Sequence, residues 1–209
     1  MRLRHLVLAF LGIALPMTAT NAAGPAQDTP ALPLGIETAR VTIAGTSNIH
    51  AYTASTTAVR ITRAQLSSAL AGPNFWDEIV KPGALEAFEI AIPAAQLSSP
   101  KEGLDKNMHK ALKAKEHADI TFRLSRLVAR DGVPGGLKAI GTLRIAGVER
   151  EVVIDITAKR GDSTLVVKGE LPLLMTDYGI APPKAMLGML KTDPKVTVTF
   201  ETVLKVPLT

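Results

Sequence analysis

The sequence has 209 residues and no cysteine, and only 4% of its residues are aromatic. Without cysteine, a disulfide-bonded scaffold, a cysteine-ligated zinc or iron–sulfur site and a cysteine nucleophile are all excluded. Few aromatic residues leave little stacking surface for nucleic-acid bases, and a net charge of +5 is too small to indicate a nucleic-acid partner. The 46% hydrophobic and 21% charged residues are typical of an ordinary globular domain.

The N-terminal region carries the three-part pattern of a secretory signal peptide. A short basic segment precedes the apolar run Leu6–Leu15, and small residues follow up to Ala23, where a signal peptidase can cut. The apolar run is shorter than the roughly 20 residues that span a bilayer. We therefore expect a cleaved signal peptide over residues 1–23, a flexible leader over 24–34, a folded domain over 35–209 and a periplasmic location.

Alternation of apolar and polar residues dominates the chain after the leader and predicts strands with one apolar face. Six stretches alternate along most of their length, namely residues 84–92, 119–127, 137–145, 151–159, 164–171 and 196–206. Residues 40–63, rich in threonine, valine and isoleucine, are expected to hold two further strands. We predict a mainly all-β fold, an antiparallel barrel of about eight strands or a sandwich.

Turns and helices complete the predicted organisation. Turn-forming residues at 130–136, 146–149 and 160–163 separate four of the strands, which favours an antiparallel meander. Residues 103–115 repeat a leucine or methionine every four positions, as in a short amphipathic helix that packs on an apolar surface. Residues 182–190, opened by two prolines, are expected to form a second short helix.

The histidines give two weak suggestions of chemistry. Asp105, His109 and His117 could ligate a metal, but a solvated face of a lysine-rich helix is the favoured interpretation because nothing indicates convergent geometry. Ser47 and His50 could form a catalytic pair, although local hydrogen bonds at the start of a strand are favoured over it. We therefore assign no catalytic residue, no metal ligand and no cofactor.

The apolar faces of the predicted strands would line the inside of a barrel, with the small residues Ala139, Gly141 and Gly169 among them. A barrel of about eight strands either fills its interior with side chains or holds one small ligand. Apolar residues serve both purposes. The residues by themselves leave a filled core and a ligand cavity equally open.

Four segments occur in an order and spacing that resemble a known family. They are Gly45–Thr53, similar to a strand of pattern G-[ST]-S-x-[IL]-H-x-[WY]; a helix and strand over 103–122; residues 141–153, similar to G-x-L-x-[IL]-x-G-V-x-[KR]-x-[VI]; and residues 175–184 before the last strand. On these segments the chain resembles the YceI-like family, secreted bacterial proteins with a lipocalin-like barrel that bind polyisoprenoid or other long apolar chains. Ala118 and Ala146 stand where proline and histidine are common, and neither is expected to touch a ligand.

The resemblance implies a cavity inside a lipocalin-like barrel, open at one end, that holds an isoprenoid, quinone or fatty lipid. It supplies no catalytic residue, and it allows a homodimer and a transient contact with a membrane. Candidate residues at the mouth or head group are His50, Tyr52, Trp76 and Tyr178, with loop packing as an equal alternative for Trp76. The predicted ligand-binding residues are Phe88, Ile90, Ile92, Ile120, Phe122, Leu124, Leu143, Ile145, Ile154, Ile156, Leu165, Val167, Val198 and Phe200.

The leading hypothesis is a periplasmic carrier of a long apolar lipid, and two other functions stay open beside it. An enzyme acting on a small apolar substrate in the same cavity would use His50 as its base. A structural or stress-response module with a filled core would contact a partner through the lysine-rich helix face that carries Lys106, Lys110 and Lys113.

Overall fold

The computed structural model describes residues 33–68, 70, 74–185 and 190–206. The chain divides into a unit Met1–Ala31 and a unit Leu32–Thr209, and every described residue belongs to the second. The predicted signal peptide and the leader up to residue 32 lie outside the described residues. Leu34, which we expected at the end of the flexible leader, is only 2% exposed, so the packed structure begins slightly before the predicted boundary.

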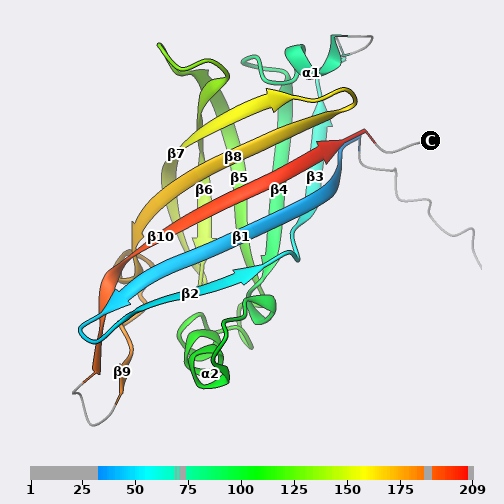
Figure 1. The fold of residues 1–209 in the computed structure, drawn as a ribbon. Coiled ribbons are helices and arrows are strands. Elements are labelled where there is room, and N and C mark those ends of the chain that lie inside the picture. The colour runs from blue at the N-terminus through cyan, green and yellow to red at the C-terminus, as the bar shows by residue number, and fades with distance from the viewer. Residues whose placement is uncertain (1–32, 69, 71–73, 186–189, 207–209) are drawn as a thin grey trace, which may run out of the picture. The chain divides into compact units, whose positions relative to one another are not determined.

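An antiparallel sheet forms most of the described structure and curls around an interior (Figure 1). Its strand order is β2-β1-β10-β8-β7-β6-β5-β4-β3, with β9 paired to β10 apart from this path. The strands are β1 (Gly35–Ser47), β2 (Ala51–Thr56), β3 (Arg60–Leu66), β4 (Leu85–Pro93), β5 (Asp119–Ala129), β6 (Gly136–Ile145), β7 (Val148–Arg160), β8 (Thr164–Leu174), β9 (Lys184–Ala185) and β10 (Leu190–Lys205). The predicted fold class, mainly antiparallel β, is confirmed.

Each of the six alternating stretches forms a strand, because every second residue of a strand faces the same side of the sheet. On β10, for example, Val196 and Leu204 are buried while Lys195 and Glu201 are exposed. The three predicted turns connect β5 to β8 as the expected meander. The expectation of two strands over residues 40–63 was wrong, since this region contributes to β1, β2 and β3. The turn between β1 and β2 contains no glycine or proline to mark it.

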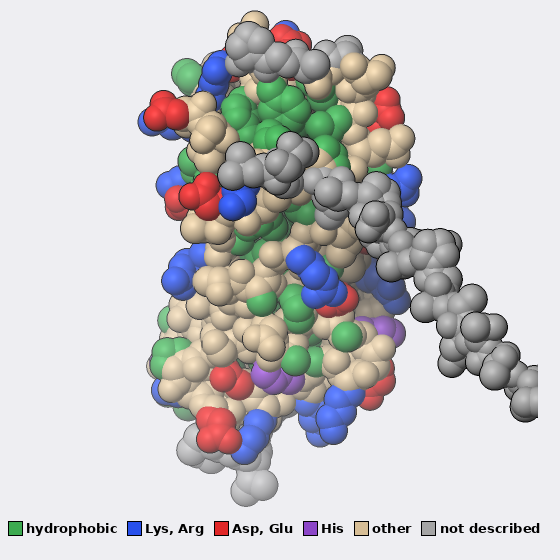
Figure 2. Space-filling view, turned by 90° about the vertical axis from the view of Figure 1, so that its right-hand side faces the viewer, with side chains coloured by type: hydrophobic (Ala, Val, Ile, Leu, Met, Phe, Trp, Pro, Cys, Tyr) green, Lys and Arg blue, Asp and Glu red, His purple; other side chains and the backbone are tan. Residues whose placement is uncertain are grey.

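The two outer strands, β2 and β3, form no ladder with each other in the part of the chain that the structure describes. β2 pairs with β1 only from Val41 to Thr46, and a single antiparallel bridge between Ser55 and Ser98 ties β2 to the segment after β4. The sheet is therefore a partly open barrel. Figure 2 looks onto the side where these edges lie and shows hydrophobic side chains gathered in its upper half.

Two α-helices lie at opposite ends of the curled sheet (Figure 1). α1 (Phe75–Glu78) lies in the connection from β3 to β4, whereas α2 (Glu102–Ala111) lies between β4 and β5. Short 3-10 helices span Ala94–Gln96 and Met175–Tyr178. The predicted amphipathic helix is thus confirmed as α2, which ends earlier than expected. We call the two ends of the sheet the α1 end and the α2 end.

The predicted helix over residues 182–190 is wrong. Its middle, residues 186–189, lies outside the described residues, but the residues on either side form β9 and the start of β10, which pair with each other. β10 begins earlier than its alternating pattern indicates. Backbone pairing along this extension outweighs the helical spacing of the apolar residues, because spacing is a weaker constraint than a sheet that is already formed.

Buried residues inside the curled sheet form two clusters. The larger one includes Leu97, Ile145 and Tyr178 at the α2 end and continues along β6 and β7. The smaller one, at the α1 end, consists of Leu34, Trp76, Ile79, Leu165 and Leu204. Within the described ranges, no helix has the length and apolar character required to cross a bilayer.

Candidate ligand cavity

The curled sheet encloses an apolar cavity of about 680 Å³. Ligand-binding pockets range from about 300 to 1,000 Å³, so this interior is hollow and the filled-core alternative is wrong. All of the residues that we predicted to bind a ligand line it: Phe88, Ile90, Ile92, Ile120, Phe122, Leu124, Leu143, Ile145, Ile154, Ile156, Leu165, Val167, Val198 and Phe200. Their contact with a ligand stays a prediction.

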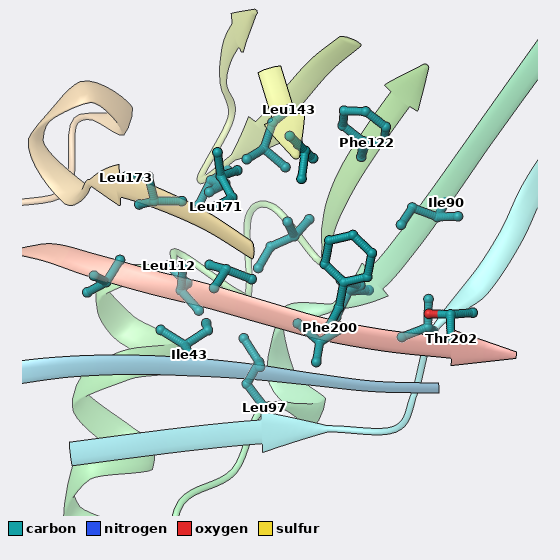
Figure 3. A pocket seen from close by; sticks show the side chains of 18 of the residues that line it. Ile43, Ile90, Leu97, Leu112, Phe122, Leu143, Leu171, Leu173, Phe200 and Thr202 are labelled. Atoms are coloured by element: carbon teal, nitrogen blue, oxygen red, sulfur yellow. The ribbon is translucent and has the colours of Figure 1, made fainter. Parts of the chain in front are cut away.

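Side chains from strands far apart in the sequence point into the same space (Figure 3). Ile43 of β1 and Phe200 of β10 come from one wall, and Leu143 of β6 and Phe122 of β5 come from the wall across the cavity. Each is an apolar residue at an inward position of its strand. Together they form a surface that favours hydrocarbon over water.

Three glycines in the wall hold space for three aromatic rings. A Cβ placed on any of these glycines would clash with an aromatic side chain of a neighbouring strand, so each ring covers the glycine beside it. The pairs are Gly45 with Tyr52, Gly141 with Phe122 and Gly169 with Phe200. The small residues were expected to leave room for a ligand. They do so indirectly, because the rings lie against the wall instead of crossing the cavity.

The α1 end of the cavity is lined by apolar side chains. Its lining residues are Leu34, Ile36, Ile79, Val80, Leu85, Leu165 and Leu204, and none of them is exposed. Trp76 packs in the same cluster and meets Phe75 edge to face, with ring centroids 4.9 Å apart. Trp76 does not line the cavity and lies at the end opposite to His50. Trp76 thus packs in the α1 cluster, where its ring anchors the β3–β4 connection, as the loop-packing alternative expects.

The cavity reaches solvent at the α2 end. The exposed lining residues lie at the start of β2 and beside the start of α2, and we call them the mouth: His50, Ala51, Thr53, Pro100, Lys101 and Asn107. Ser99 and Thr192 line the cavity nearby. No aspartate or glutamate among the described residues lines the cavity. The mouth is therefore polar, with the positive charge of Lys101 on one side.

Both tyrosines line the α2 half of the cavity. Tyr52 is half-buried beside the mouth, whereas Tyr178 is only 2% exposed and belongs to the wall. Burial raises the pKa of both hydroxyls, helped by the charge of Asp193 at Tyr52 and of Asp177 at Tyr178, where Arg150 opposes the effect. Both hydroxyls stay protonated at neutral pH, so each can donate a hydrogen bond to a ligand.

The turn between β1 and β2 fixes the position of His50. The Ser47 hydroxyl donates to the His50 carbonyl over 2.8 Å and accepts bonds from the N–H groups of Ile49 and His50. The Asn48 side-chain oxygen accepts a bond of 2.8 Å from the Lys191 N–H, which ties the turn to β10. Ser47 thus makes local bonds to backbone, as we favoured, since its hydroxyl bonds the backbone groups of Ile49 and His50 in the turn.

Two polar contacts hold α2 on the segment that follows β4. His109 Nε2 lies 2.8 Å from the Leu97 carbonyl oxygen, and the Asp105 carboxylate accepts a bond of 2.7 Å from the Ser99 N–H. His117 packs on the turn between β6 and β7. The three residues considered as metal ligands therefore have separate structural contacts. Across the described ranges, no group of three potential ligands converges.

A family model of the YceI-like domain matches residues 37–204. The match covers most of the chain and nearly all of the described sheet. The chain belongs to the YceI-like family. The resemblance carried by the four sequence segments is thus confirmed. No curated protein matches the chain.

Solved structures share the fold at low sequence identity. The protein BcnA of Burkholderia cenocepacia is 14% identical, with a TM-score of 0.62 over 79% of this chain and 95% of its own. A polyisoprenoid binding domain from Saccharophagus degradans is 13% identical, with a TM-score of 0.59 over 85% of this chain and 100% of its own. A YceI protein of Campylobacter jejuni is 14% identical, with a TM-score of 0.52 over 98% of this chain and 95% of its own.

The residues that line the mouth on the α2 side were not predicted from the sequence. Ser99, Lys101 and Asn107 reach the cavity because the segment around α2 folds back under the sheet, with Leu104 and Met108 lining the cavity as well. The apolar face of the helix was a usable signal, since an amphipathic helix must cover an apolar surface. The surface it covers is the cavity itself.

Proposed function

We propose that the protein binds one long apolar lipid, of isoprenoid, quinone or fatty-acid type, and carries it in the periplasm. The observation that carries this proposal is the apolar cavity of about 680 Å³ that extends from the apolar α1 end to the mouth. The structural relative from Saccharophagus degradans is a polyisoprenoid binding domain, which supports this kind of ligand. A buried CH₂ contributes about 0.8 kcal/mol, so roughly ten buried carbons contribute about 8 kcal/mol before ordering costs.

The distribution of polar side chains sets the direction of the ligand. At the α1 end the nearest polar lining residue is Thr202, whereas the α2 end offers Tyr52, Lys101 and Asn107. A polar head group at the α1 end would lose its hydrogen bonds to water without replacement, which costs about 1–3 kcal/mol. The head group therefore lies at the mouth and the tail points toward α1.

The single tryptophan of the sequence allows a direct test of binding and direction. Trp76 packs at the α1 end, so a heavy atom near the end of the ligand's tail should quench its fluorescence. We expect a fatty acid brominated near its tail to quench Trp76 in the delipidated protein, and the same acid brominated beside its carboxylate to quench weakly. Equal quenching by both acids contradicts the direction. Binding of neither these acids nor an isoprenoid quinone contradicts the function.

A variant that fills the cavity separates binding from folding. Ala139 lines the cavity and is 5% exposed, so Ala139→Phe places a ring in the empty space without adding charge. The variant should fold and should lose bound lipid. Val153→Phe is the matched control, because Val153 is 51% exposed on β7 and does not line the cavity. A folded Ala139→Phe protein that retains lipid like the wild type contradicts binding in the interior.

The enzyme alternative has a simple test. The family and the cavity support binding, and we propose that no reaction accompanies it. If His50 were a catalytic base, His50→Ala would abolish any turnover of an apolar ester or aldehyde measured with the wild-type protein. We expect no turnover by either protein.

Location and assembly belong to the same proposal. We propose that residues 1–23 direct export and are removed, so Edman sequencing of the protein from a periplasmic fraction should begin at residue 24. We also propose transient contact with a membrane during loading. The outer edge of β3, unpaired in the described residues, supports a homodimer formed edge to edge, which light scattering of the purified protein would detect as twice the monomer mass.

A further inference from the structure

The turn between β1 and β2 presents a large apolar side chain to solvent beside the mouth. Ile49 is 59% exposed, more than any other large hydrophobic residue that the structure describes as exposed. The turn is held by the Ser47 hydroxyl and by two bonds between Asn48 and Lys191. The isoleucine is therefore displayed at a fixed place next to His50, the first residue of the mouth.

Basic side chains flank this isoleucine and the mouth. Lys191, which is exposed, bonds through its backbone to the turn that carries Ile49. Lys101, also exposed, lies across the mouth at the start of α2. No acidic side chain of the described residues forms an ion pair with either lysine. Both ammonium groups are available to an anionic partner.

The acidic residues of the same segments are engaged in local contacts. Glu102 forms an ion pair of 2.9 Å with Lys106 within α2. Asp193 accepts a hydrogen bond of 2.8 Å from the Lys195 N–H. Lys110 is exposed at this end as well and adds positive charge. Asp105 and Asp193 keep their charges, since the hydrogen bond that each accepts comes from a backbone N–H group, but Lys101, Lys110 and Lys191 outnumber them. The charge around the mouth is thus positive on balance and complements a negatively charged surface.

We propose that Ile49, Lys101 and Lys191, which we call the mouth surface, dock on an anionic phospholipid bilayer. This inference rests on the proposed lipid-binding function and names the surface that loads and unloads the cavity. An apolar side chain inserted at the level of the acyl chains, with lysines beside the lipid phosphates, is the arrangement of peripheral membrane proteins. With Ile49 inserted, the mouth opens at the bilayer surface, so a lipid tail enters the cavity without crossing water.

Vesicle flotation tests the proposal with the protein isolated from a periplasmic fraction, so that every variant carries the same N-terminus as the wild type. The probes are vesicles of phosphatidylcholine with phosphatidylglycerol and vesicles of phosphatidylcholine alone. We expect the wild type to float with the anionic vesicles and to be released by salt, as screening requires. The variant Ile49→Ser should bind the anionic vesicles about tenfold more weakly, because it loses one inserted apolar side chain. The double variant Lys101→Glu/Lys191→Glu should float no better with anionic than with neutral vesicles.

Two control variants test whether the effects are specific to the mouth surface. Val153→Ser changes an exposed apolar residue of β7, 51% exposed, and Lys138→Glu changes a basic residue of β6 far from the mouth in the sheet; both should bind vesicles like the wild type. Equal flotation of Ile49→Ser and Val153→Ser, or no preference of the wild type for anionic vesicles, overturns the proposal. Lipid extracted from the same proteins is a separate readout. If the wild type retains lipid but does not bind vesicles, only the docking inference is contradicted. If it holds no lipid, the proposed function is contradicted.

Discussion

The two ends of the cavity are built from the same strands but from different residues. At the α1 end, Leu34, Ile79 and Leu204 are buried, and among the described lining residues only Thr202 offers a bound lipid a polar partner. At the α2 end, exposed polar side chains surround the opening, and two tyrosines line this half of the cavity. A symmetrical barrel would hold an apolar chain in either direction. The difference between the ends gives the cavity a direction, and it also predicts that the same kind of mutation has unequal effects at the two ends.

The largest difference should follow from placing a carboxylate at each end. Leu165 is 5% exposed in the α1 cluster, so Leu165→Asp buries a charge without a partner and should lower the free energy of unfolding by about 4 kcal/mol or more. Thr192→Asp, near the mouth, should cost about 1 kcal/mol at most because water reaches it. Urea unfolding of both variants measures the two costs. Equal costs would show that the ends do not differ in polarity.

A second comparison removes an anchor from each end. Trp76 is 6% exposed, and Trp76→Ala should lower the free energy of unfolding by about 3 kcal/mol, since the surrounding cluster cannot close over the space. Met108→Ala should cost less, because Met108 is only partly buried and faces the hollow part of the cavity. Thermal unfolding followed by circular dichroism gives both values. A larger effect at Met108 would make α2, and not the α1 cluster, the main support of the barrel.

The glycines that lie under aromatic rings sharpen the comparison further. A Cβ at Gly169 would push on Phe200 and Ile156 inside the wall, so Gly169→Ala should cost about 2 kcal/mol and should lower lipid affinity by moving the ring into the cavity. A Cβ at Gly45 meets the far end of the Tyr52 side chain, which can turn toward the mouth, so Gly45→Ala should cost less than about 1 kcal/mol. Urea unfolding and lipid titration of both variants check this order.

The smallest effect concerns pH. Burial raises the pKa of Tyr52 and Tyr178 above the ordinary value of 10.0. Below that value both hydroxyls are protonated in the folded and unfolded states, and pH does not change their contribution. Above it the unfolded chain releases these protons first, so stability falls as pH rises through the folded pKa. Tyr52→Phe and Tyr178→Phe should each remove part of this loss, as unfolding measured at neutral and alkaline pH would show.

The walls of the cavity could be predicted from the sequence because alternation is local. On β10 each inward residue, such as Val198 or Phe200, is marked by the polar residues on either side of it, and no knowledge of other strands is needed. The same holds for the antiparallel meander, whose turns contain glycine. The fold class and the lining residues therefore followed from short segments read one at a time.

The mouth could not be predicted in the same way, because its residues meet only after the chain has folded. Asn107 lies in α2 and Lys101 directly precedes it, whereas His50 comes from the turn after β1, and no sequence pattern relates them. The position of Trp76 could not be predicted for the same reason. An aromatic residue in a loop packs at whichever end the loop reaches, and the sequence does not say that the β3–β4 connection lies opposite to the β1–β2 turn.

Mass spectrometry of an organic extract tests the central claim most directly. The protein is purified without detergent from the periplasm of its native host, and Ala139→Phe is purified in parallel. We predict one equivalent of an isoprenoid, quinone or fatty acid from the wild type and almost none from the variant. Wild-type protein that contains no lipid and takes up none after delipidation would contradict the account that the cavity is a lipid site.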